Sequence, residues 1–264
     1  MAPRPEEKDF PYWLVAVVLL GLFFLYRIIS DDLHAQILTT LFKGVRITIF
    51  VTLVSFALAS TVGLLLALGT GSKWLFVRQV VRFYVEIVRG VPIIVLLLYV
   101  AFVLAPAMVA LWNWAVVRVG IEPLQTRDFS LLWRAIIALM IAYSAFISEV
   151  FRAGFQSVDD GQVEAARALG LNRWQRFRLV VLPQAFRTIL PPLGNDFVAM
   201  VKDSSLVSVL GVLDVTQLGK VTAASNFRYF ETYNVVALVY LTMTIGLSLV
   251  LRHLERHLRR NAPR

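Results

Sequence analysis

The chain has 264 residues, of which 58% are hydrophobic and only 16% are charged, and its mean hydropathy is +0.72. This composition excludes a disordered chain and an ordinary soluble domain, because either would need far more polar residues. A formal net charge of +9 would suggest nucleic acid as the partner of a soluble protein, but cationic loops on one side of a bilayer give the same total. Cysteine is absent from the sequence, which excludes disulfides and thiolate metal sites. We therefore predict an all-α membrane protein.

Long apolar runs predict a polytopic bundle of about six transmembrane helices. The first run extends from Phe10 to Tyr26. We interpret it as a retained helix, because a cleaved signal peptide would need a positive segment before it and a small-residue cleavage site after it. The other runs are Ile47 to Leu68, roughly Ile87 to Trp112, Leu131 to Val150, Leu190 to Leu213 with an interruption, and Val235 to Leu251.

The distribution of Lys and Arg predicts the orientation of this bundle, because basic residues near helix ends are retained in the cytoplasm. Alternate segments between the runs hold 17 basic residues in one set and 8 in the other, with Lys202 left inside the fifth run. The larger set includes both ends of the chain. Both termini are therefore expected in the cytoplasm, and the basic excess is explained by topology.

Small residues recur every four positions along the second run. They are Ser55, Ala59, Gly63, Ala67 and Gly71. Such a row lets two backbones approach closely, so a neighbouring helix from this chain or from a second copy is expected to pack there. The alternative is a helix that is merely rich in alanine and glycine.

The longest polar stretch, residues 152–187, has the start and stop signals of two short helices, which predict a helical hairpin rather than a linker. Asp159 and Asp160 can cap a first helix, which Gly170 closes in a left-handed conformation. Asn172 and Gln175 have the spacing of a capping box for a second helix. That second helix is expected to continue until Pro183 interrupts it.

The first helix of this hairpin is narrow and alanine-rich, with Glu164 and Arg167 as its charged edge. This shape suits insertion into a groove on another protein. A hairpin that only caps the helix bundle is the alternative.

The hairpin also carries a family resemblance. Glu164-Ala165-Ala166, three residues, Gly170, nine residues and Val180-Val181-Leu182-Pro183 resembles the EAA loop of ABC importer permeases. Flanking residues narrow the resemblance to the polar amino-acid branch, the permeases for His, Gln, Arg, Glu and related substrates. These residues are Tyr143, Glu149-Val-Phe-Arg152-Ala-Gly154, Gln156-Ser157, Gly161-Gln162, Leu190-Pro191-Pro192, Asn195 and Lys202-Asp203-Ser204-Ser205-Leu206. The resemblance extends from about Leu38 to the C-terminus.

The resemblance implies that the first hairpin helix is a coupling helix in a groove of an ATPase subunit, with Glu164, Ala165, Ala166 and Gly170 matching the motif. It also implies a second permease copy or a similar permease, an extracytoplasmic solute-binding protein, and an amino-acid substrate. The sequence lacks the P-loop pattern G-x-x-x-x-G-K-[ST], so no cofactor is expected in this chain, and ATP and Mg are expected on the partner ATPase.

No residues have the pattern of a catalytic or metal site. The three histidines, His34, His253 and His257, fall in loop or tail positions without ligand spacing. The chain is therefore not expected to be an enzyme.

Polar residues interrupt the fifth apolar run. If Pro191 lies near the cytoplasmic boundary, the helix from Pro191 to Val201 covers about 17 Å, roughly half of a bilayer core. Charges at that depth usually face a cavity or each other. We expect a broken helix that lines the substrate pathway, with Lys202 and Asp203 at opposite ends of a zwitterionic solute. The pathway residues are Asn195, Asp196, Lys202, Asp203, Ser204 and Ser205. Alternatively, Lys202 and Asp203 neutralise each other or lie at the outer interface.

Two further acids lie beside apolar runs. Glu86 is spaced for surface ion pairs with Arg82 and Arg89, and Glu149 for a pair with Arg152. We expect structural pairs at both positions, which leaves Asp196 as the better candidate for the pathway.

Three parts are expected in the chain. They are a tail and additional helix (1–36), a permease domain (37–252) and a basic cytoplasmic tail (253–264). The resemblance implies the membrane subunit of an ATP-driven importer in the bacterial inner membrane. A transporter or channel driven by an ion gradient is the alternative, but it does not explain the hairpin. A membrane scaffold would explain the hairpin but not the charges inside the membrane.

Overall fold

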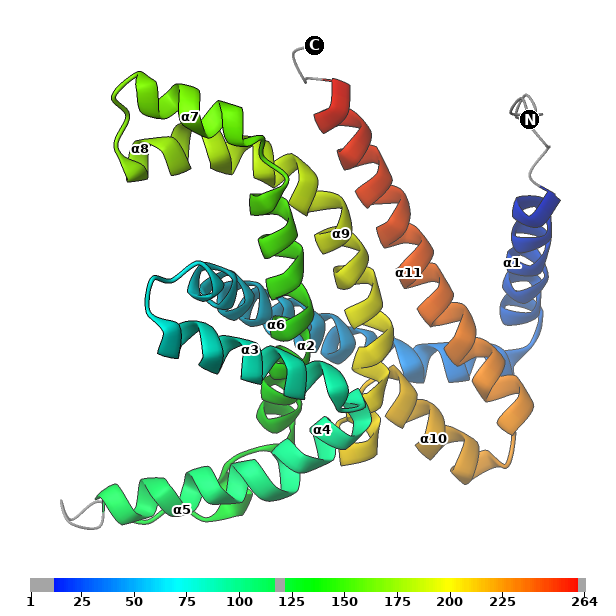
Figure 1. Ribbon diagram of the computed structural model, residues 1–264. Helices are drawn as coiled ribbons and strands as arrows, with labels where there is room; N and C mark the ends of the chain where they lie inside the picture. Colours follow the sequence, from blue (N-terminus) through cyan, green and yellow to red (C-terminus); the bar gives the residue numbers. More distant parts are fainter. Residues whose placement is uncertain (1–11, 117–121, 261–264) are drawn as a thin grey trace.

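The computed structural model describes residues 12–116 and 122–260, and within these ranges every regular element is helical (Figure 1). The elements are α1 (Tyr12–Ser30), α2 (Asp32–Thr70), α3 (Leu75–Gly90), α4 (Ile93–Tyr99), the π-helix η1 (Val100–Leu104), α5 (Ala105–Val116), the 3₁₀ helix η3 (Thr126–Asp128), α6 (Leu131–Gln156), α7 (Asp160–Ala168), α8 (Arg173–Arg176), the π-helix η4 (Phe177–Val181), α9 (Leu182–Asp203), the 3₁₀ helix η5 (Ser204–Leu210), α10 (Val215–Asn226) and α11 (Tyr229–Arg260). The predicted all-α class is confirmed.

Four stretches in the described residues are long and apolar enough to cross a membrane. They are Asp32–Thr70, Ile93–Val116, Leu131–Gln156 and Tyr229–Leu254. The first and fifth predicted runs also form helices, α1 and α9, but neither is among these four. The total of six spans therefore stays a prediction.

The third predicted run is divided in the structure. α3 ends at Gly90, and Pro92 then begins the separate helix α4, while Val91 between them is extended. The division has a local cause, because proline lacks a backbone N–H and disfavours a helical conformation in the residue before it. A continuous helix from Ile87 to Trp112 was the wrong expectation.

Buried small residues join α2 to α6, the most extensive contact between two helices in the bundle. Ser55, Ala59, Gly63 and Ala67 are all buried. The Ser55 hydroxyl donates a hydrogen bond to the Ile136 carbonyl of α6 at 3.3 Å. A side chain at Gly63 would come within 3.0 Å of Ile147 and of the Ser144 carbonyl. The expected neighbour is therefore a helix of this chain, whereas Gly71 lies beyond the end of α2.

A buried arginine connects the start of α6 to the π-helix η1. Arg134 donates to the carbonyls of Phe129 at 2.8 Å and Ala101 at 3.0 Å, and also to the Thr126 carbonyl. Its guanidinium also lies over the Phe129 ring, 5.8 Å from the ring centre. The carbonyl oxygens take the place of a carboxylate partner for this cation and fix the bend between α4 and α5.

The helix α10 lies at the opposite end of the bundle from α7 and α8 (Figure 1). Buried Asp214 caps α10 by accepting from the N–H groups of Thr216 and Gln217, and it also accepts from the Tyr240 hydroxyl of α11 at 2.9 Å. Gly44 of α2 lets this turn approach, since a Cβ there would be 2.6 Å from the Val215 nitrogen. α10 is thus held between α2 and α11.

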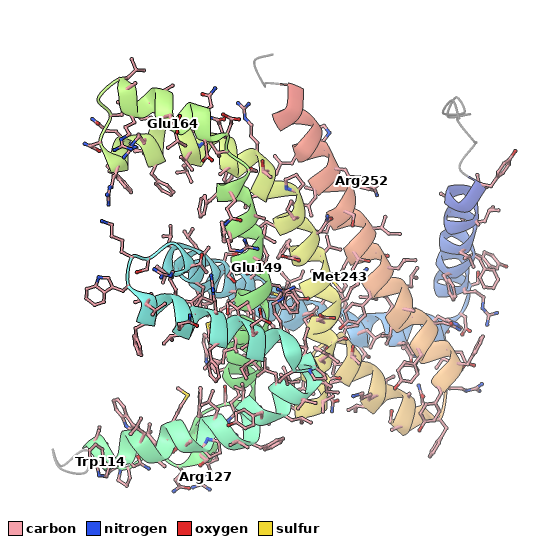
Figure 2. All side chains as sticks on the ribbon, in the orientation of Figure 1. Trp114, Arg127, Glu149, Glu164, Met243 and Arg252 are labelled. Carbon is pink, nitrogen blue, oxygen red and sulfur yellow. The ribbon has the colours of Figure 1, made fainter. Side chains whose placement is uncertain are left out.

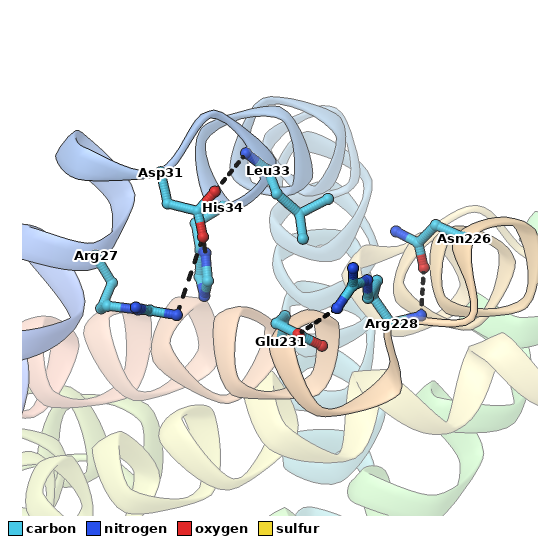
Figure 3. A network of polar contacts seen from close by, with 7 residues as sticks. All are labelled: Arg27, Asp31, Leu33, His34, Asn226, Arg228 and Glu231. Atoms are coloured by element: carbon cyan, nitrogen blue, oxygen red, sulfur yellow. Dashed lines mark hydrogen bonds and ion pairs between the residues drawn. The ribbon is translucent and has the colours of Figure 1, made fainter.

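Polar contacts fix the turn between α1 and α2 (Figure 3). Asp31 accepts from the Leu33 N–H at 3.0 Å and contacts the buried His34 ring at 2.8 Å, and Arg27 lies 3.9 Å away. The Leu33 hydrogen bond, followed by the contacts with His34 and Arg27, lowers the pKa of the Asp31 carboxyl. His34 is therefore buried in the first turn of α2 beside its cap, and not in a loop as the sequence suggested.

Gly63→Val tests the contact between α2 and α6. The new side chain would collide with Ile147 and the Ser144 backbone, so we expect a loss of about 1–3 kcal/mol in the free energy of unfolding. Thermal unfolding of the purified chain in detergent measures it. The matched control is Gly246→Val on α11, where nothing lies within 4 Å of an added Cβ. Equal losses in the two variants would contradict the close contact.

Candidate functional site

The hairpin between α6 and α9 has the caps that the sequence predicts. Asp159 begins α7 by accepting from the Gly161 N–H at 2.7 Å. Gly170 has φ +78°, and the Leu171 N–H returns to the Ala166 carbonyl at 3.2 Å, which closes the helix. Asn172 and Gln175 form both hydrogen bonds of the capping box at 2.9 Å. Local hydrogen bonds therefore define both ends of the hairpin turn.

One face of α7 is buried and the other is free. Ala166 is buried and Val163 packs against the hydrophobic cluster at the base of the hairpin. Glu164, Ala165 and Arg167 are exposed, and Leu169 at the tip is 81% exposed. Figure 2 shows Glu164 at the end of the molecule that the hairpin forms. The predicted coupling residues other than Ala166 and the turn residue Gly170 thus lie together on an accessible ridge.

The second hairpin helix does not stop at Pro183 as expected. α8, η4 and α9 follow one another without a break in the helical backbone. Pro183 falls in the first turn of α9, directly after the π-helix η4, and proline is tolerated in a first turn. Phe177 of η4 packs against Phe155 of α6, with ring centres 5.7 Å apart. The hairpin is consequently continuous with both α6 and α9.

The predicted pathway residues of α9 lie on two faces. Asn195 and Lys202, two turns apart, are both exposed. Asp196 and Asp203, also two turns apart, face α6, where the buried Tyr143 hydroxyl donates to Asp203 Oδ2 at 2.7 Å. Ser204 is buried and donates to the Val201 carbonyl at 2.7 Å, whereas Ser205 is half-buried. The six residues therefore do not form one cluster.

Asp196 has a distinctive environment. Its Oδ2 atom is buried and has no hydrogen-bond partner among the described residues. Asp203, two turns further along α9, accepts from the Tyr143 hydroxyl instead. Of the two acids of α9, only Asp203 therefore has a partner on α6 within the described ranges.

Lys202 and Asp203 do not pair with each other, because no ion pair joins them in the described part of the chain. The helix break that was expected after them is present, since α9 ends at Asp203 and the 3₁₀ helix η5 begins at Ser204. Neutralisation of the two side chains by each other was therefore the wrong alternative.

The expected pairs at the other two acids have opposite outcomes. Glu149 and Arg152 form an ion pair of 2.6 Å, as expected, and Figure 2 shows Glu149 on α6 toward the middle of the molecule. Glu86 forms no ion pair with Arg82 or Arg89, although all three residues are described. The expectation at Glu86 was wrong, because side chains three or four residues apart can extend into solvent separately.

Tyr143 was not predicted as a residue of the pathway. A lone tyrosine inside an apolar run gives only a weak signal, since its hydroxyl can be satisfied by any nearby acceptor. His253 is exposed, and the side chain of His257 lies outside the described residues. No group of three or more His, Asp or Glu residues in the described ranges could hold a metal ion.

Comparison with known proteins adds to these observations. Residues 59–260 match the family described as "Binding-protein-dependent transport system inner membrane component". The chain is 35% identical to the glutamine transport system permease protein of Escherichia coli (strain K12), over 83% of this chain and 93% of the relative. It is also 35% identical to a probable amino-acid permease protein of Bacillus subtilis (strain 168), over 82% of this chain and 90% of the relative.

Solved structures agree with the family match. A crystal structure of an amino acid ABC transporter with histidines has a TM-score of 0.69 and 33% identity, over 83% of this chain and 94% of the other. A bacterial ABC transporter for import of alginate has a TM-score of 0.67 at 18% identity, which supports the fold alone. The fold and the hairpin define the permease subunit of an ABC importer. The chain belongs to the family of binding-protein-dependent transport system inner-membrane components, in which the ATPase is a separate subunit.

Tyr143→Phe tests the contact between α6 and α9. Loss of a hydrogen bond to a carboxylate should reduce the free energy of unfolding by about 1–3 kcal/mol. Thermal unfolding in detergent measures this loss. Tyr233→Phe on α11 is the control, because Tyr233 is 41% exposed and the structure gives its hydroxyl no hydrogen bond. A Tyr143 variant as stable as the control would show that the contact contributes nothing.

Proposed function

We propose that this permease subunit imports polar amino acids, with ATP and Mg bound by a separate ATPase dimer. The exposed ridge of α7 carries the proposal, because its caps are complete while Glu164, Ala165 and Leu169 have no partner surface within the described chain. The names of the relatives support an amino acid as the solute. Residues 37–252 would form the permease domain.

The complex would contain a second permease copy or a similar permease and an extracytoplasmic solute-binding protein. The hairpin and both termini would lie in the cytoplasm, in agreement with the basic residue count. The start of α1 and the end of α11 lie at the same end of the bundle as the hairpin (Figure 1). α10 and the tip of α5 lie at the other end, where the binding protein would deliver solute.

The route of coupling follows from the contacts of the hairpin. α7 and α8 connect α6 to α9. Phe155 near the end of α6 packs against Phe177 of η4, which directly precedes α9. The same two helices carry the bond from Tyr143 to Asp203. Movement of α7 in an ATPase groove would therefore be transmitted to both helices that line the proposed pathway. Alternating access then requires different solute affinities in the two states of the bundle.

The pathway would use Asn195 and Lys202 on the exposed side of α9, Asp196 and Asp203 of the same helix, and Ser205 in η5. An unpaired lysine at this depth is costly unless it faces water or a partner. Ser204 would help to shape the helix break rather than touch solute, since its hydroxyl bonds its own helix.

Glu164→Lys tests the ATPase contact. Glu164 would lie in the groove of the ATPase subunit, where a reversed charge should be repelled. We expect capture of the ATPase subunit in a pull-down to fall at least about tenfold, because like charges at an interface cost several kcal/mol. The matched control is Glu122→Lys, the same change at an exposed position beyond α5. Undiminished capture by the Glu164 variant would refute the coupling role.

Uptake by proteoliposomes that contain the permease, its ATPase and its binding protein tests the substrate class. A panel of radiolabelled L-glutamine, L-glutamate, L-arginine, L-histidine and a sugar should show ATP-dependent accumulation of at least one amino acid and not of the sugar. Accumulation by the permease alone, driven by an ion gradient, would instead support the secondary transporter.

A further inference from the structure

Arg89 lies at the end of a helix that has three distinct faces. The core face of α3 is built from buried Val81, Val85 and Val88. A second face is apolar but exposed, and its members, spaced at three or four residues, are Phe76, Val80, Phe83 and Ile87. The third face is charged, and its members are the half-buried Arg78 and the exposed Arg82, Glu86 and Arg89. An exposed apolar face suits lipid or a partner helix, so the charged face needs a different neighbour.

The position of Arg89 sets it apart from the other charges of α3. It lies about 21 Å along the helix axis from Leu75, at a rise of 1.5 Å per residue, and the apolar stretch Ile93–Val116 follows directly. Arg78, in contrast, donates to the carbonyls of Ser72 and Lys73 at the end of α2. Arg89 is the last charged residue before that stretch, where a cation is favourable only beside water or a ligand.

The guanidinium of Arg89 is held by an aromatic ring and by nothing else in the described chain. It lies over Phe146 of α6, 5.7 Å from the ring centre. The structure gives it no hydrogen bond or ion pair. A ring fixes the plane of a guanidinium and leaves its N–H groups free to donate. Arg89 is therefore an oriented donor without an acceptor.

The ring of Phe146 is also connected, through Tyr143, to an acid of α9. Phe146 packs against Tyr143 with ring centres 6.2 Å apart, and the Tyr143 hydroxyl holds Asp203. Arg89 of α3 and Asp203 of α9 are thus connected through two neighbouring aromatic side chains of α6.

We propose that Arg89 binds the carboxylate of the transported amino acid, while Asp203, held by Tyr143, provides the negative pole for a positive group of the same solute. The proposal rests on the proposed function and adds a residue to it. A planar guanidinium can bind a carboxylate through two parallel hydrogen bonds, which a lysine cannot reproduce. This geometry selects solutes that carry a carboxylate and tolerates different side chains.

Equilibrium dialysis with the purified permease–ATPase complex tests the proposal without the binding protein, which would otherwise select the solute first. The probes are radiolabelled L-glutamine, L-arginine and L-glutamate, each in competition with its own α-carboxamide. In the unaltered complex the carboxamide should bind at least about tenfold more weakly than the amino acid. Arg89→Gln should lower the affinity for the amino acid by a factor of about 10–100 and remove the preference for the amino acid over its carboxamide. Arg89→Lys should restore only part of it.

Two further variants separate binding from folding. Arg82→Gln removes a cation from the same face of α3, about two turns earlier, and should leave affinity and discrimination unchanged. Phe146→Leu keeps the cation but removes the ring, so it should lower affinity severalfold. Each variant is first compared with the unaltered complex by basal ATP hydrolysis and by elution volume.

The possible outcomes are decisive. An Arg89→Gln complex that still prefers the amino acid over the carboxamide overturns the proposal. Absence of binding by the unaltered complex also overturns it, even if uptake in proteoliposomes succeeds and the proposed function stands. Failure of both uptake and ATPase capture would instead refute the proposed function itself.

Discussion

The close approach of α6 to α2 is the contact on which the rest of the structure depends. Gly63 and its small neighbours allow α6 to lie directly against the α2 backbone, and Ser55 adds a hydrogen bond to it. Such contacts matter in lipid, where the hydrophobic effect does not drive helices together. α6 then carries Tyr143, Phe146 and Glu149 and continues into the hairpin. The packing of α6 on α2 therefore fixes the positions of these side chains and of the hairpin relative to α2.

The hairpin is directly connected to α6 and α9, the two helices that carry Tyr143 and Asp203. α7 is joined to α6 by a short turn and to α9 through α8 and η4, with no flexible linker on the α9 side. The two π-helices occur next to regions where the bundle bends, and wide turns of this kind are frequent at functional positions. The helical elements from α8 to the end of α9 thus follow one another without an intervening loop.

Much of this arrangement could be predicted from local patterns. Asp159, Gly170 and the pair Asn172 and Gln175 define the hairpin because caps act over three or four residues, and the structure forms each of them. The end of α9 before Ser204 was also predicted, from the polar residues that interrupt an apolar run. The break at Pro92 and the continuity through Pro183 were not predicted, because the outcome at a proline depends on whether a turn or a helix precedes it.

The sequence alone determined the membrane class, the hairpin with its caps, the row of small residues and the family motif, since each depends on composition or on short spacings. Only the tertiary structure decided which helix covers the row of small residues, that Asp203 bonds Tyr143 rather than Lys202, and that Arg89 lies over Phe146. These facts depend on side chains from helices far apart in the chain. Their meeting is set by crossing angles and packing, which no local spacing encodes.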